Sequence, residues 1–99
     1  MNLGGLQIPS TKLDFFIRSV EIASYIPGRV RLYSRHMIGN PQLEAQVRQQ
    51  LESFVELDAV ETNIRSGSIL IHYQPERLHR NAELSKVEAY IKTHVRRRK

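Results

Sequence analysis

Residues 60–73 read Val-Glu-Thr-Asn-Ile-Arg-Ser-Gly-Ser-Ile-Leu-Ile-His-Tyr, and they predict a β-hairpin. Two runs rich in β-branched residues alternate in polarity, which is the period of a half-buried strand. The three residues 65–67 separate them and end in a glycine, which can take a positive φ in a short hairpin loop. In the second strand one face is expected to hold Ile69, Ile71 and Tyr73, and the other Leu70 and His72.

A helix is predicted on the N-terminal side of this hairpin, over residues 41–54. Asn40 can cap it through its side-chain oxygen, and Pro41 suits the first helical position because its missing N–H would be unpaired there. Apolar residues then recur at three- and four-residue spacing, which makes one apolar stripe. That stripe is Leu43, Val47, Leu51 and Phe54. We expect the polar opposite face, including Glu44 and Arg48, to lie in water.

A second helix is predicted on the C-terminal side, over residues 82–95. Asn81 is a candidate cap, and Pro75 offers an earlier start. The apolar stripe of this helix is Leu84, Val87, Ile91 and Val95. Its carboxylates are expected to be solubilising partners of nearby lysines and arginines.

Residues 19–34 predict two further strand segments, separated by Pro27-Gly28. Proline cannot donate to a strand ladder, so it marks a break, a bulge or an edge. The second segment, residues 29–34, places Val30 and Leu32 on one face. The other face of that segment carries Arg29, Arg31 and Tyr33. In the first segment we expect Val20, Ile22 and Ser24 to share a face.

The order strand, helix, hairpin, helix is typical of an α+β, ferredoxin-like split βαβ sandwich. We expect two helices on one face of a three- to four-stranded antiparallel sheet. No strand candidate follows the second helix, so the final strand is either missing or replaced by the N-terminal segment. The division along the chain is a flexible lead-in over 1–12, a single domain over 13–95 and a basic tail over 96–99.

Composition narrows the function classes. The chain has 99 residues, enough for one domain, and no cysteine, which excludes disulfides, thiolate zinc sites and a cysteine nucleophile. No run approaches the roughly 18–20 apolar residues that span a bilayer, and we expect a cytoplasmic protein. The net charge is +5, and the last four side chains carry four of these charges. The remainder is nearly neutral, so the charge is weak evidence for a nucleic-acid-binding fold.

Residues 26–32 (Ile-Pro-Gly-Arg-Val-Arg-Leu), the helix start at 39–41 and the hairpin at 60–73 resemble a divergent heavy-metal-associated (HMA-like) domain. Such domains begin P-type metal-transporting ATPases and occur as small stand-alone bacterial proteins. The resemblance implies a ferredoxin-like fold and a role in metal transport or storage. Ordinary members bind copper or zinc through a CxxC pair between the first strand and first helix. The matching loop, residues 34–39, has no cysteine, so no ligand residues carry over.

Four groups of residues are candidates for function. His36 and Met37 lie in the loop where the family holds its metal, and imidazole plus thioether could hold a soft transition metal weakly. Arg29, Arg31, Tyr33 and His72 could form an interaction surface on an uncovered sheet face. Arg96, Arg97, Arg98 and Lys99 could contact phosphate or anionic lipid. His72, His79 and His94 show no shared zinc spacing, and we expect each to be a single exposed histidine.

The residues favour binding over catalysis. No nucleophile–base set, no G-x-S-x-G context and no glycine-rich phosphate loop is present, so we expect no enzyme and no catalytic residues. The main hypothesis is an accessory or docking domain of bacterial metal homeostasis, with no resident cofactor, whose partner is a protein such as a metal-transporting ATPase or a storage protein. The alternatives are a nucleic-acid-binding module and a weak His/Met metal chaperone. An open sheet edge could also pair two copies as a homodimer.

Overall fold

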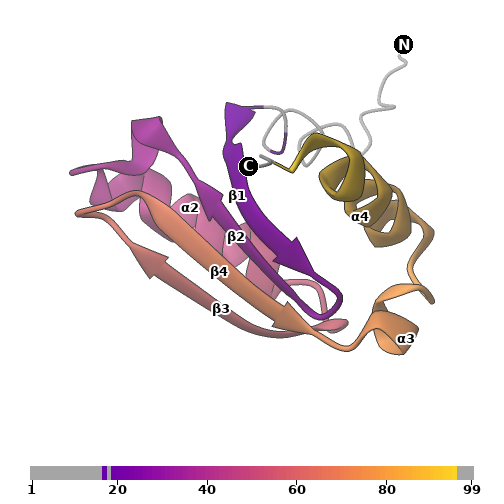
Figure 1. The fold of residues 1–99 in the computed structure, drawn as a ribbon. Helices are drawn as coiled ribbons and strands as arrows, with labels where there is room; N and C mark the ends of the chain where they lie inside the picture. Colours follow the sequence, from indigo (N-terminus) through magenta and orange to yellow (C-terminus); the bar gives the residue numbers. More distant parts are fainter. Residues whose placement is uncertain (1–16, 18, 96–99) are drawn as a thin grey trace, which may run out of the picture.

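The computed structural model describes residue 17 and residues 19–95 (Figure 1). Its elements in chain order are β1 (Glu21–Ile26), β2 (Arg29–Tyr33), the 3-10 turn η1 (Arg35–Met37), α2 (Pro41–Glu52), β3 (Leu57–Asn63), β4 (Ser68–Tyr73), α3 (Pro75–Leu78) and α4 (Ala82–His94). The predicted lead-in, residues 13–16 and the basic tail lie outside the described residues.

The four strands form one antiparallel sheet in the order β1-β2-β4-β3. The predicted hairpin is β3–β4, and β2 pairs with β4 on its other side. β1 turns back through Pro27-Gly28 and forms the edge beside β2. The expected α+β, ferredoxin-like fold is therefore confirmed, and the N-terminal segment supplies the fourth strand.

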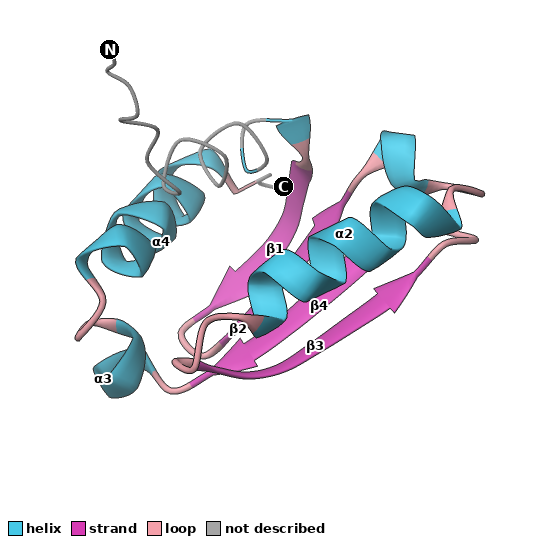
Figure 2. Ribbon diagram, turned by 180° about the vertical axis from the view of Figure 1, so that it is seen from behind, coloured by secondary structure: helices cyan, strands magenta, loops and turns pink. Residues whose placement is uncertain are grey.

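Both long helices cover the same face of the sheet (Figure 2). In that view α2 lies over the sheet and runs along the strands, and α4 lies on the β1 side of α2. The two apolar stripes meet the inward residues of the strands in a single core, as expected for a two-layer domain. The fully buried members of largest volume are Leu32, Met37 and Ile69. The other buried apolar residues are Ile17, Ile22, Val30, Val47, Leu51, Ile71, Tyr73, Leu78, Leu84 and Ile91.

The predicted helix caps are both present. The side-chain oxygen of Asn40 accepts from the backbone N–H of Leu43 at 3.1 Å, and Pro41 is the first residue of α2. The side-chain oxygen of Asn81 accepts from the N–H of Glu83 at 3.0 Å. Pro75 also starts a helix, the short α3, so the two predicted starts belong to two separate helices.

The hairpin and the first strand each differ from the prediction in one respect. β3 begins at Leu57 and not at residue 60, because its first residues pair with the end of β4. In β1 the register shifts between Ile22 and Ser24, as in a β-bulge. The extra residue turns Ser24 outward and brings Tyr25 to the helix-covered face, so the expected face of Ser24 was wrong.

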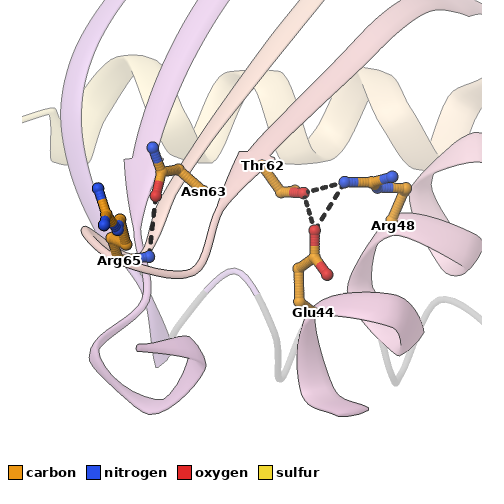
Figure 3. A network of polar contacts seen from close by, with 5 residues as sticks. All are labelled: Glu44, Arg48, Thr62, Asn63 and Arg65. Atoms are coloured by element: carbon orange, nitrogen blue, oxygen red, sulfur yellow. Dashed lines mark hydrogen bonds and ion pairs between the residues drawn. The ribbon is translucent and has the colours of Figure 1, made fainter. Parts of the chain in front are cut away.

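Glu44 of α2 was expected to lie in water, but it contacts the sheet. Its carboxylate accepts hydrogen bonds from Arg48 at 2.6 Å and from the hydroxyl of Thr62 in β3 (Figure 3). The side chain of Glu44 is only 19% exposed, because β3 lies beneath this part of α2. Figure 3 also shows Asn63, which accepts from the backbone N–H of Arg65 and shapes the hairpin turn.

Removing the Thr62 hydroxyl tests this link between α2 and β3. Thr62→Val keeps the side-chain shape but deletes one bond to a carboxylate, so we expect the free energy of unfolding to fall by about 1 kcal/mol. Urea denaturation measures it. A double-mutant cycle with Glu44→Gln should give a coupling energy of about 0.5 kcal/mol or more. Additive effects of the two changes would contradict the network.

Candidate functional site

The uncovered face of the sheet carries the four residues predicted as an interaction surface. In β2, Val30 and Leu32 point into the core, and therefore Arg29, Arg31 and Tyr33 point to the opposite face. Register sets Arg29 beside His72, Arg31 beside Leu70 and Tyr33 beside Ser68 of β4. Strand alternation thus gathers Arg29, Arg31, Tyr33 and His72 on two neighbouring strands. We call these four residues with Leu70 the open-face cluster.

The two arginines of the open-face cluster are exposed and have no acidic partner within residues 17 and 19–95. None of the ion pairs between described residues includes Arg29 or Arg31. His72 lies 3.9 Å from the carboxylate of Glu61 in β3, at the side of the face away from the arginines. Arginine and aromatic residues are both enriched at protein interfaces, and here two arginines without an ion-pair partner among the described residues lie on the same face as an aromatic ring.

His36 and Met37 occupy η1, between β2 and α2, but they differ in environment. The side chain of Met37 is completely buried in the core, and His36 is exposed. Met37 therefore packs beneath the loop while His36 faces solvent. His94 is also exposed; its Nδ1 donates to the carbonyl oxygen of Tyr90 at 2.8 Å, and its ring stacks on that of Tyr90. Residues 96–99 lie outside the described part of the chain.

A second polar cluster, which the sequence reasoning missed, surrounds Glu88 of α4. The hydroxyls of Tyr25 and Tyr73 each donate to its Oε2 at 2.8 Å. Nε2 of His79 lies 2.6 Å from its Oε1. The Glu88 side chain is 7% exposed and that of His79 is 51% exposed. We call Tyr25, Tyr73, His79 and Glu88 the Glu88 cluster.

The Glu88 cluster joins segments that are distant in the sequence. Tyr25 comes from β1, Tyr73 from the end of β4, His79 from the turn after α3 and Glu88 from the middle of α4. Glu88 was expected to be a solubilising carboxylate, which was wrong, because it is buried. His79 is exposed as expected, but it is paired with Glu88. The sequence position of Glu88 could have indicated its burial, because it lies four residues after Leu84 and three before Ile91, within the apolar stripe of the helix.

The cluster shifts the pKa of its members in ways that follow from burial. Burial by itself would raise the pKa of Glu88. Hydrogen bonds from His79, Tyr73 and Tyr25 lower this pKa by more than burial raises it, so the pKa lies below its usual value. Burial and the adjacent Glu88 raise the pKa of Tyr73 well above its usual value. Burial raises the pKa of Tyr25 in the same direction. The carboxylate is thus ionised and both phenols are protonated near neutral pH.

The pKa of Glu88 predicts an acid-dependent loss of stability. A carboxyl whose pKa is lower in the folded chain stabilises it above the unfolded pKa, near 4.5, and this stabilisation is lost as the pH falls through the folded pKa. Glu88→Gln cannot titrate, so its unfolding free energy should depend less steeply on pH below about 4.5. Urea denaturation at a series of pH values measures both slopes. Parallel curves for the two proteins would contradict the assignment.

Fold and sites together define a cysteine-free, ferredoxin-like domain with an open sheet face and a buried carboxylate cluster. Residues 12–93 match a protein family described as "Heavy metal associated domain 2". The match covers most of the chain, and the chain is a member of that family. No curated protein and no solved structure matches the chain. The resemblance seen in the sequence is thereby confirmed.

Two absences bear on what the described residues can do. No helix among them is long and apolar enough to cross a membrane. No three histidine, aspartate or glutamate side chains within residues 17 and 19–95 gather so as to hold a metal ion.

Proposed function

We propose that the chain is a non-catalytic docking domain of metal homeostasis, acting in the cytoplasm on a metal-transporting ATPase or a metal-storage protein. The observation that carries the proposal is the open-face cluster, with two arginines that have no acidic partner among the described residues. Membership in a heavy-metal-associated family supports the metal context. The absence of cysteine argues against the thiolate site by which such domains carry metal.

The composition of the open face favours a protein partner over nucleic acid. Sheets of this fold that bind RNA stack two or three bases on aromatic side chains. On the described strands, Tyr33 is the one phenol or phenyl ring that faces outward, and Leu70 adds an aliphatic surface beside it. Arginine, tyrosine and leucine together suit a partner that offers carboxylates around an apolar centre.

A charge reversal on the open face tests the docking proposal. Binding of the purified chain to the soluble domains of the same organism's metal-transporting ATPases and storage proteins is measured by calorimetry. Arg31→Glu should weaken binding at least about tenfold, because like charges then face each other. Lys86→Glu, an exposed reversal on α4, makes the same change in net charge and should alter binding less than about twofold.

Equal effects of the two reversals would show that binding depends only on net charge, and would overturn the assignment of the open face as the binding surface. Binding to none of these proteins, with tight binding to a short RNA, would replace the proposal by the nucleic-acid alternative. The His36–Met37 chaperone is tested separately by amide NMR titration with Cu⁺, Zn²⁺ and Fe²⁺. Saturable amide shifts confined to residues 34–41 would favour the chaperone hypothesis. Because Met37 is completely buried, we expect no such shifts.

A further inference from the structure

The Glu88 cluster gathers four potential metal-binding atoms that no carboxylate-and-imidazole pattern in the sequence signals. They are two phenol oxygens, one carboxylate and one imidazole nitrogen. We propose that this cluster is a binding site for a hard, highly charged cation, with ferric iron as the ion to test. The site is separate from the open-face cluster, and the inference does not depend on the docking proposal.

The separations within the cluster suit a coordination sphere. An octahedral ion with bonds of about 2.0 Å holds neighbouring ligand atoms about 2.8 Å apart. Both phenol oxygens lie 2.8 Å from the same Oε2 of Glu88. Oε2 of Glu88 and each phenol oxygen are therefore spaced as neighbouring ligands of one octahedral ion would be, and a cation bound there releases the two phenol protons to water.

The donor types select the kind of cation. Phenolate and carboxylate oxygens are hard donors, and imidazole suits iron among the first-row metals. Both phenols donate hydrogen bonds to Glu88 and are therefore protonated in the metal-free chain, so the bound cation must carry enough charge to displace their protons. A trivalent ion does this better than Zn²⁺ or Cu⁺, for which the family's usual ligand is a thiolate.

The cluster reaches the surface at His79. Glu88 and Tyr73 are buried, whereas the side chain of His79 is 51% exposed. An imidazole on the turn after α3 can move aside and return as a ligand, and water can fill the outward positions of the sphere. The cluster lies where β1, β4 and α3 end, and the loop in which the family holds its metal, residues 34–39, follows β2.

The test is the visible absorption that arises when phenolate binds ferric iron. The full chain is titrated with ferric nitrilotriacetate, and we expect a charge-transfer band that saturates at one ion per chain. Tyr73→Phe and Tyr25→Phe keep the ring but remove a donor, and each should lower the affinity at least about tenfold, since loss of a partner of a bound metal commonly costs about 10–100-fold. Tyr33→Phe, on the open face, is the matched control and should leave the band unchanged.

A second measurement, on the unmodified chain, keeps the proposal testable even if a variant fails to fold. Ga³⁺ has the charge and preferences of ferric iron without its paramagnetism, so amide NMR can locate it. We expect shifts at residues 25, 73, 79 and 88 in the unmodified chain, and a weaker response in the half-exposed His79→Ala variant. No band in the unmodified chain, an unchanged affinity in Tyr73→Phe, or an equal loss in Tyr33→Phe would each overturn the proposal and leave a purely structural cluster.

Discussion

Replacing Glu88 with alanine should lower the free energy of unfolding by about 3 kcal/mol. The change removes the acceptor of the buried Tyr73 hydroxyl and of the half-buried Tyr25 hydroxyl, and an unsatisfied buried polar group costs about 1–3 kcal/mol. It also removes a carboxylate that ties α4 to the ends of β1 and β4. Chemical denaturation by urea, followed by circular dichroism, measures the loss.

Glu52→Ala is the matched control for this substitution. Glu52 is exposed at the end of α2 and makes no side-chain bond in the described structure. Both changes exchange glutamate for a better helix former, so propensity contributes similarly to each. A loss at Glu88 no larger than at Glu52 would show that the cluster does not stabilise the fold.

Gly67→Ala should cost about 3 kcal/mol, because two separate effects add. Gly67 has φ +77°, a left-handed conformation that costs other L-residues about 1–2 kcal/mol. An added Cβ would also clash with the carbonyl oxygen of Ser34, so the backbone must shift. That shift would strain the bond from the Ser34 N–H to the Gly67 carbonyl, now 2.8 Å long.

Gly39→Ala separates conformational strain from the steric clash. Gly39 has φ +66°, yet nothing lies within 4 Å of the Cβ that alanine would add. It should therefore cost only about 1–2 kcal/mol. Thermal or urea unfolding of the two variants compares them directly. Equal losses would mean that the close approach of the hairpin turn to the loop after β2 contributes nothing.

The sequence alone determined the elements and the faces of the central strands. Alternation placed Val30 and Leu32 opposite Arg29, Arg31 and Tyr33, because side chains of a strand alternate strictly when the register is regular. Asn40 and Asn81 marked helix starts, because their capping bonds reach only two or three residues along the chain. These signals are local, and the structure agrees with them.

The tertiary structure decided what depends on contacts between distant segments. A one-residue bulge in β1 exchanged the faces of Ser24 and Tyr25, since a strand has period two and a single extra residue reverses every later side chain. Only that reversal brings Tyr25 to Glu88, which is 63 residues further along the chain.

The open-face and Glu88 clusters illustrate the same division. Four members of the open-face cluster were predicted, because two strand patterns with the same period were enough to place them. The Glu88 cluster was missed, because each member looks ordinary in its own segment and only the packing of α4 against the ends of β1 and β4 joins them. Local periodicity thus determines which side chains share an element's face, and tertiary packing determines which faces meet.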